Sequence, residues 1–103
     1  MTRATLTRQA RLDLQAATRR IGADNLSAAY ALNDAVLDAA RRIGGNPAIG
    51  AHRLALADQR YRFWPLRRFS YLLVYTDQAD PPRILRLVHM ARDLPKLLAD
   101  LPV

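Results

Sequence analysis

The chain has 103 residues and a net charge of +7, with 50% hydrophobic and 24% charged residues, which is typical of one globular domain with a modest core. The absence of cysteine excludes a disulfide scaffold, a thiolate metal site and a cysteine nucleophile, and two histidines, His52 and His89, are too few for a histidine-rich metal site, so we expect no bound metal. No apolar run approaches the roughly 20 residues that span a bilayer, and residues 1–10 lack the pattern of a signal peptide, so we expect a soluble, cytoplasmic protein with no membrane partner.

The N-terminal part predicts a short edge strand followed by a helix. Residues 3–6 alternate weakly between polar and apolar. Thr7 is a suitable N-cap, because its hydroxyl can accept a hydrogen bond from an amide of the first helical turn. Gly22 is a plausible stop, since glycine tolerates the left-handed conformation that often ends a helix. The apolar positions at helical spacing are Ala10, Leu14, Ala17 and Ile21.

A second helix is predicted directly after the first. Asp24 and Asn25 can cap it, and the Gly-Gly-Asn-Pro run at 44–47 ends it. The two helices then form a hairpin whose many alanines allow close approach. Its apolar stripe is predicted as Leu26, Ala29, Tyr30, Val36, Leu37, Ala40 and Ile43. The aspartates spaced for the helix surfaces, which we do not expect to bind metal, are Asp13, Asp34 and Asp38.

The second half of the chain predicts strands. Residues 52–57 suit either a short strand or an irregular link. Asp93 can cap a short final helix with Pro95 in its first turn, and leucines 94, 97 and 98 are expected to pack inward. The predicted strands are 61–64, closed by Pro65, then 69–76 and 83–89, with a hairpin loop at 77–82.

This element order predicts an α+β fold. An N-terminal helical hairpin packs on one face of a twisted antiparallel sheet of three to four strands, and a short C-terminal helix follows. On the strand at 83–89, strict alternation places Ile84, Arg86 and Val88 on one face and Leu85 and Leu87 on the other. We expect a single domain over residues 1–103.

The charge comes from arginine. Fifteen arginines and one lysine face nine aspartates and no glutamate. Such a surface favours polyanions or acidic protein partners, and arginine suits bidentate recognition of phosphate or carboxylate. The codon bias of a GC-rich genome is an alternative reason for arginine over lysine, but it does not explain the net charge.

Three motifs, in this order, resemble those of the RelE/ParE superfamily of type II toxin–antitoxin toxins. Residues 10–14 (Ala-Arg-Leu-Asp-Leu) have the form Ala-x-x-Asp-Leu in the first helix. Residues 46–50 (Asn-Pro-Ala-Ile-Gly) are similar to the family's link into the sheet. Residues 71–75 (YLLVY), a loop and residues 84–93 (ILRLVHMARD) are similar to its C-terminal strands. The resemblance covers nearly the whole chain and is closer to ParE than to RelE.

The resemblance implies a function. ParE-like toxins inhibit DNA gyrase, trap its cleavage complexes and stop replication, whereas RelE-like toxins cut mRNA in the ribosomal A site. Both are held inactive by a cognate antitoxin whose C-terminal segment wraps the toxin. For this chain it implies growth arrest through DNA gyrase, a role in plasmid or chromosome stabilisation, an antitoxin partner with an acidic segment, no cofactor and no sequence-specific DNA binding of its own.

The residue chemistry favours the gyrase inhibitor over the nuclease. RNA cleavage needs a base, an acid and a phosphate stabiliser, which ribosome-dependent relatives supply with Glu or Lys, Arg and a C-terminal His-Tyr pair or Tyr. Here glutamate is absent, the only lysine is Lys96, and Met90 follows His89. Because aspartate can replace glutamate and His89 can act alone, mRNA cleavage by His89, Arg92 and Arg68 is the alternative. A third class, a basic nucleic-acid-binding module without toxicity, predicts salt-dependent binding to bare DNA.

Arginines are densest between residues 53 and 68, where five face Asp58 alone and aromatic residues interleave with them. This suits a nucleic-acid or protein interface; the alternative is a solvated strand pair with its aromatics in the core.

His89 either shapes the toxic surface or fixes the corner after its strand through a backbone hydrogen bond. We expect Arg86, costly if buried unpaired, to face the open groove that the antitoxin covers. The residues assigned to target binding and toxicity are Arg60, Arg62, Arg67, Arg68, His89 and Arg92. Those assigned to antitoxin binding are Arg53, Trp64, Tyr71, Leu73 and Arg86.

One expectation concerns the toxin without its antitoxin. The open face of the sheet should expose apolar groups from Trp64, Leu73 or Leu85, so the free protein should be poorly soluble or oligomeric.

Overall fold

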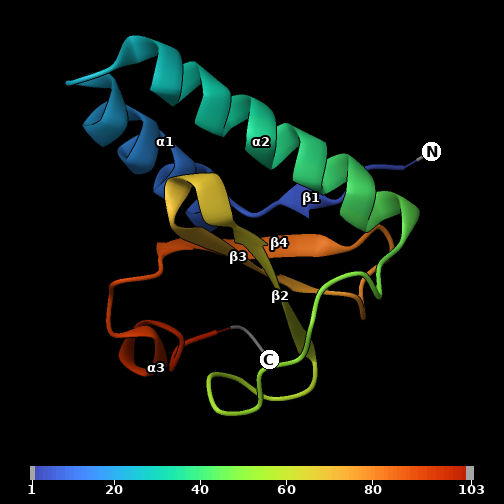
Figure 1. The fold of residues 1–103 in the computed structure, drawn as a ribbon. Coiled ribbons are helices and arrows are strands. Elements are labelled where there is room, and N and C mark those ends of the chain that lie inside the picture. The colour runs from blue at the N-terminus through green and yellow to red at the C-terminus, as the bar shows by residue number, and fades with distance from the viewer. Residues whose placement is uncertain (1, 102–103) are drawn as a thin grey trace.

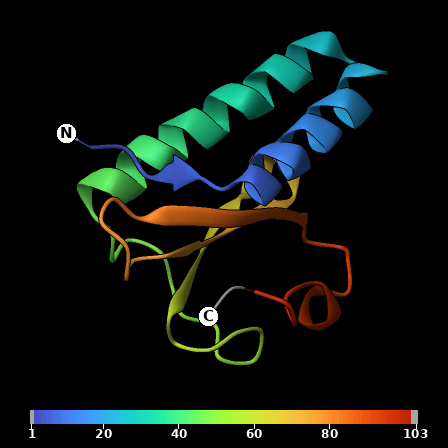
Figure 2. The ribbon, with the colours of Figure 1, turned by 180° about the vertical axis from the view of Figure 1, so that it is seen from behind.

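Two antiparallel helices lie across one face of a four-stranded sheet, and a short helix and a long loop lie against the other face (Figures 1 and 2). This computed structural model describes residues 2–101. The predicted α+β class is confirmed. In chain order the elements are β1 (Thr5–Leu6), α1 (Arg8–Gly22), α2 (Leu26–Gly45), β2 (Tyr61–Leu66), the 3-10 turn η1 (Arg67–Phe69), β3 (Tyr71–Thr76), β4 (Arg83–His89) and α3 (Leu94–Leu97).

The sheet has the strand order β1-β4-β3-β2. Strand β3 pairs antiparallel with both β2 and β4, as expected, but β1 pairs parallel with β4. The sheet is therefore mixed rather than wholly antiparallel, because α1 and α2 lie between the N-terminal strand and the rest of the sheet in the sequence. The predicted edge strand at 3–6 is confirmed as the two-residue β1.

The predicted helix starts are confirmed. The Thr7 hydroxyl accepts from the amide of Ala10, and the Asn25 side chain accepts from the amide of Ala28. The stop at Gly22 has a different cause from the one predicted, since no described glycine has a positive φ and Ala23 is the C-cap. A Cβ on Gly22 would lie 3.4 Å from the Cβ of Ala29, so this glycine allows α1 and α2 to approach closely.

The apolar stripe of α2 is only half as predicted. Ala29, Val36, Ala40 and Ile43 are buried, together with Leu32 and Ala39, which the prediction left out. The prediction was wrong for Leu26, Tyr30 and Leu37, which are exposed. Their positions lie about 100° around the helix from the buried stripe, on the outer side of the hairpin.

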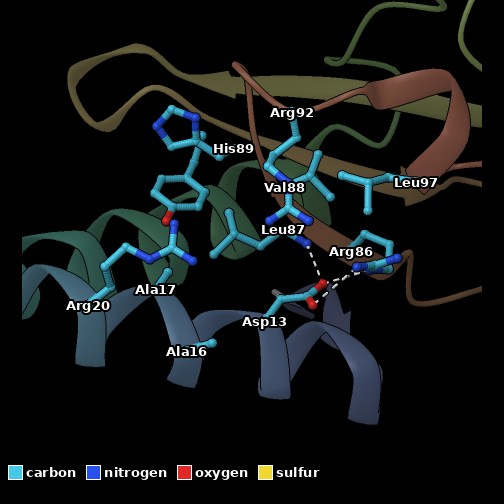
Figure 3. Close-up of a pocket in the computed structure, with 11 residues that line it drawn as sticks. Asp13, Ala16, Ala17, Arg20, Arg86, Leu87, Val88, His89, Arg92 and Leu97 are labelled. Carbon is cyan, nitrogen blue, oxygen red and sulfur yellow. Dashed lines mark hydrogen bonds and ion pairs between the residues drawn. The ribbon is translucent and has the colours of Figure 1, made fainter.

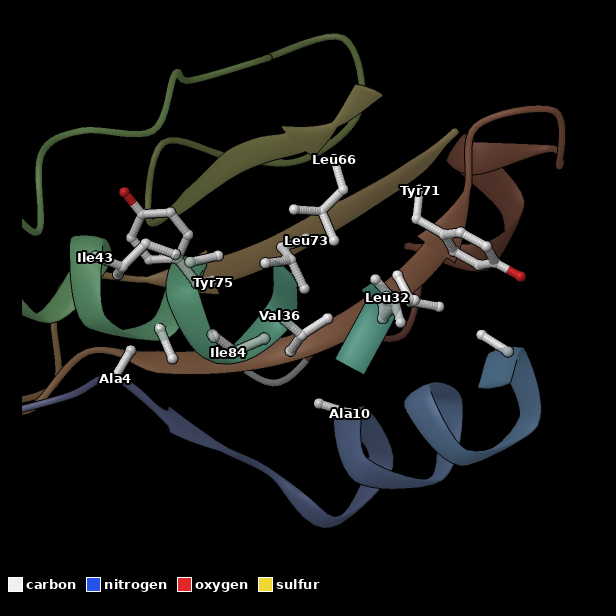
Figure 4. Close-up of a cluster of buried hydrophobic side chains, with 14 residues drawn as sticks. Ala4, Ala10, Leu32, Val36, Ile43, Leu66, Tyr71, Leu73, Tyr75 and Ile84 are labelled. Carbon is white, nitrogen blue, oxygen red and sulfur yellow. The ribbon is translucent and has the colours of Figure 1, made fainter. Parts of the chain in front are cut away.

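The core has two parts, one on each side of the sheet. The helix side contains Leu73 and Tyr75, both completely buried, beneath α1 and α2 (Figure 4). The other side contains Phe63 and Leu85, covered by leucines of α3 and of the loop before β2. The expectation that an open face of the sheet exposes Trp64, Leu73 or Leu85 was therefore wrong. On the helix side Leu73 is 0% exposed and Trp64 packs partly buried against the cluster, and on the other side Leu85 is 5% exposed.

Strand β4 contains a bulge. Val74 pairs with Arg86 and Tyr75 pairs with Ile84, so Leu85 is one residue extra. Ile84 and Leu87 consequently belong to the helix-side cluster, while Leu85 and Val88 belong to the other. The predicted alternation was wrong here, because a bulge moves every later side chain to the opposite face.

Two further strand boundaries differ from prediction. Strand β3 begins at Tyr71 rather than at residue 69, because Arg67–Phe69 form η1, and the end of β2 differs as well. Pro65 does not close β2, which continues to Leu66; proline is tolerated because β2 is an edge strand. Of the two alternatives for residues 52–57, the irregular link is observed, preceded by a single bridge between Ala51 and Phe63.

Candidate functional site

The link between α2 and β2 is tied to one end of β3. The Tyr75 hydroxyl donates to the carbonyl of Pro47 at 2.7 Å and accepts from the amide of Gly50 at 2.8 Å. A Cβ on Gly50 would lie 2.6 Å from the Tyr75 ring, so only glycine fits. Burial raises the pKa of Tyr75 above its ordinary value. The Asn-Pro-x-x-Gly motif therefore has a structural explanation.

Arg62 reinforces the same link. Its Nε donates to Asp77 at 2.6 Å, and its terminal nitrogen donates to the carbonyl of Gly50 at 2.8 Å. Both side chains of the ion pair are mostly buried, with 19% and 24% exposure. The guanidinium of Arg62 is thus paired within the fold and stabilises the link between α2 and β2.

Arg60 and Arg53 lie near this end of the sheet as well. Arg60 pairs with Asp58 at 2.9 Å on the surface, and this contact lowers the pKa of the aspartate and raises that of the arginine. The guanidinium of Arg53 lies 6.0 Å from the centre of the Phe63 ring. Arg53 is exposed and available to a partner.

Arg67 and Arg68 form a separate basic site on η1. Both are exposed, and the guanidinium of Arg68 lies 5.2 Å from the centre of the Phe69 ring. They border a hollow of about 470 Å³ between η1 and α2. The other residues that line this hollow are Ala31, Asp34, Ala35, Leu66 and Phe69.

Strand β1 pairs with only the first residues of β4. Further along β4, side chains of Thr7 and of α1 bond to its backbone groups. The Thr7 hydroxyl donates to the carbonyl of Leu85 at 3.1 Å. The carboxylate of Asp13 accepts from the Leu87 amide at 3.0 Å and from Arg86 Nε at 2.8 Å. Arg86 is therefore paired rather than free, and the Asp of the Ala-x-x-Asp-Leu motif anchors α1 to β4.

A pocket of about 110 Å³ lies between α1 and the end of β4, and it is the candidate functional site (Figure 3). Residues one turn apart on α1 form one wall, since positions 13, 16, 17 and 20 share a helix face. The opposite wall comes from β3, β4 and the segment after β4. The lining residues are Asp13, Ala16, Ala17, Arg20, Tyr71, Arg86, Leu87, Val88, His89, Arg92 and Leu97.

His89 is held in one orientation at this pocket. The amide of Ala91 donates to its Nδ1 at 3.1 Å. An Nδ1 that accepts a hydrogen bond leaves the proton of the neutral ring on Nε2. The ring also meets the ring of Tyr71 edge-on, with the centroids 5.1 Å apart. The predicted backbone hydrogen bond at this corner is confirmed, and the same residue also lines the pocket.

The guanidinium groups of Arg20 and Arg92 have no ion-pair or hydrogen-bond partner within residues 2–101. Arg20 reaches from α1 towards the end of β4 (Figure 3). The Tyr71 hydroxyl points out of the core cluster (Figure 4), and it too makes no hydrogen bond within that range. Sequence reasoning missed Arg20, because its helical spacing shows only an exposed position.

The structure divides the sequence-predicted site residues among separate places. It brings Tyr71, Arg86, His89 and Arg92 together in the pocket. Arg67 and Arg68 lie at η1, and Arg53, Arg60 and Arg62 lie near the opposite end of β3. Trp64 is partly buried, and Leu73 was wrongly placed on a surface. No group of three or more potential metal ligands occurs within residues 2–101, and none of the helices there is long and apolar enough to cross a membrane.

The fold is shared with a solved toxin–antitoxin structure. A structure described as "Chromosomal ParDE TA system from P. aeruginosa" superimposes with a TM-score of 0.70 at 22% identity, over 86% of this chain and 96% of the other. No curated protein matches the sequence.

A family model described as "ParE toxin of type II toxin-antitoxin system, parDE" matches residues 4–94. The chain therefore belongs to the ParE toxin family. The resemblance read from the three motifs is confirmed.

Proposed function

We propose that this ParE-family toxin inhibits DNA gyrase, thereby arrests growth, and is neutralised by a cognate antitoxin with an acidic segment. The observation that carries the proposal is the family match over residues 4–94. The net charge of +7 suits an acidic partner.

For target binding we keep only those assigned residues whose side chains form no ion pair within residues 2–101. Arg62 is occupied inside the fold and Arg60 is paired with Asp58. The exposed arginines of η1, Arg67 and Arg68, are available, as are His89 and Arg92 at the pocket. We assign target binding to these residues, and antitoxin binding to Arg53, Tyr71 and the neighbourhood of Arg86.

A supercoiling assay tests the proposal. Purified toxin should inhibit gyrase acting on relaxed plasmid, and the double variant Arg67→Gln/Arg68→Gln should inhibit it less. Arg41→Gln/Arg42→Gln is the matched control, because these consecutive exposed arginines lie away from the hollow and pair with Asp38. Unimpaired gyrase at a large excess of wild-type toxin would contradict the proposal.

Ribosome-dependent mRNA cleavage is the second candidate function. One observation favours it: a histidine, a tyrosine and two arginines whose side chains are unpaired within residues 2–101 meet at one pocket. Such groups can supply the acid, the base and the phosphate stabiliser of phosphodiester cleavage. The absence of glutamate and the methionine after His89 favour gyrase. Cuts in translated mRNA that appear with wild-type toxin and vanish with His89→Ala would establish the nuclease.

A further inference from the structure

The pocket between α1 and β4 is lined by both apolar and polar residues. The apolar residues that line it are Ala16, Ala17, Leu87, Val88 and Leu97. Its hydrogen-bonding groups come from the polar residues around them. Such a site suits a ligand with a short apolar stem and a polar end group.

The polar groups that remain open at this pocket are all donors. Arg20 and Arg92 carry two positive charges without a partner within residues 2–101, and His89 presents Nε2–H. The Tyr71 hydroxyl can donate as well. The one carboxylate that lines the pocket, from Asp13, is already used by Arg86 and by the Leu87 amide. A ligand that satisfies this set must be an acceptor with negative charge.

We propose that this pocket binds the side-chain carboxylate of a glutamate or aspartate in the acidic segment of the antitoxin. This inference rests on the proposed function for the source of the carboxylate. The carboxylate lies between Arg20 and Arg92, and its methylene stem contacts the alanines of α1. A nucleic-acid phosphodiester fits less well, because it carries a sugar on each side, whereas a pocket of about 110 Å³ admits one stem.

The proposal has a consequence for neutralisation. His89 and Arg92, which the proposed function assigns to the target, line the same pocket as Arg20. A carboxylate bound there occupies them directly. The antitoxin then competes with the target for the same donors.

Titration with small probes tests the carboxylate preference. The probe is N-acetyl-glutamate N-methylamide, and its neutral match is N-acetyl-glutamine N-methylamide. In ¹H–¹⁵N spectra of the intact toxin, we expect the glutamate probe to shift the side-chain Nε–H signals of Arg20 and Arg92 and the ring signals of His89. The glutamine probe should leave them in place.

Variants locate the site. Arg20→Gln and Arg92→Gln should each weaken binding of the glutamate probe by about tenfold, as loss of one charged hydrogen-bonding partner predicts. Arg19→Gln is the matched control, because Arg19 is the exposed neighbour on the same helix and does not line the pocket. Circular dichroism of each variant verifies that the fold is intact.

Three results would overturn the proposal: equal shifts with both probes, unchanged binding in Arg20→Gln, or tighter binding of dimethyl phosphate than of the glutamate probe, which would assign the pocket to a phosphodiester. These outcomes are independent of the supercoiling assay. A toxin that inhibits gyrase but ignores the glutamate probe disproves only this inference, and one that binds the probe but leaves gyrase unimpaired disproves only the proposed target.

Discussion

The two ends of β3 use arginine in opposite ways. At the Thr76 end, Arg62 donates to Asp77 and to the carbonyl of Gly50, and the Tyr75 hydroxyl both donates and accepts. At the Tyr71 end, the pocket holds Arg20 and Arg92 with no partner in the described part of the chain.

This difference distinguishes arginines that stabilise the fold from arginines that are available to bind a partner. A guanidinium that already satisfies a carboxylate and backbone carbonyls stabilises the fold and has little left for a partner. A guanidinium that borders a pocket and has no partner within the fold contributes little to stability and is available to bind a ligand. Density of arginine in the sequence does not distinguish the two, because Arg62 lies in the densest basic segment and Arg20 lies outside it.

The largest effect on stability is expected at the occupied end. Gly50→Ala places a methyl group against the Tyr75 ring and the Phe63 carbonyl, so the free energy of unfolding should fall by about 3 kcal/mol. Gly45→Ala, at an exposed position, is the control and should cost nothing. Chemical denaturation measures both, and equal stability of the two variants would show that the link is not tightly packed.

Arg62→Met should have the next largest effect. It removes the ion pair with Asp77 and the hydrogen bond to Gly50, so the unfolding free energy should fall by about 2 kcal/mol. Arg60→Met removes an exposed ion pair with Asp58 and should leave the denaturation midpoint in place. A large loss of unfolding free energy in Arg60→Met, or no loss in Arg62→Met, would contradict the contrast between arginines paired within the fold and arginines on the surface.

Tyr75, at the same end of the sheet, should make the stability of the protein depend on pH. Its pKa is raised in the folded state above the ordinary value of about 10, so the folded protein keeps the proton that the unfolded chain releases first. Its contribution to stability is therefore complete below pH 10 and is lost as the pH rises towards the folded-state pKa. Thermal unfolding between pH 8 and 11 should show this fall. A curve of Tyr75→Phe that falls as steeply as wild type would assign the effect to other groups.

The smallest effect on stability is expected at the open end. Arg20→Gln and Arg92→Gln should each change the unfolding free energy by less than about 0.5 kcal/mol, because neither arginine has a folded partner to lose. Chemical denaturation measures this directly. A loss as large as that in Arg62→Met would show that these side chains are structural.

Local signals explain why the elements were predictable. The caps Thr7, Asn25 and Asp93 each accept a hydrogen bond from the amide three residues later, and all three bonds form. The strand at 83–89 and the loop before it follow from composition alone, and their bounds are as predicted. These features depend on residues near one another in the sequence.

The missed features depend on distant residues. The exposure of Leu26 and Tyr30 is set by where α1 and the sheet cover α2, which the stripe itself does not reveal. Leu73 is buried because the helices cover its face of the sheet. Arg20 becomes part of a site only because α1 crosses the end of β4, 69 residues from His89 in the sequence.

The bulge at Leu85 determines which compartment receives the end of β4. With strict alternation from Ile84, His89 would lie on the same face as Leu85, on the side of α3 and the second core. The single extra residue returns it to the side of Tyr71 and α1. One inserted residue thus shifts the alternation of the strand, so that β4 contributes core residues on both sides of the bulge and still places its last residue, His89, at the pocket.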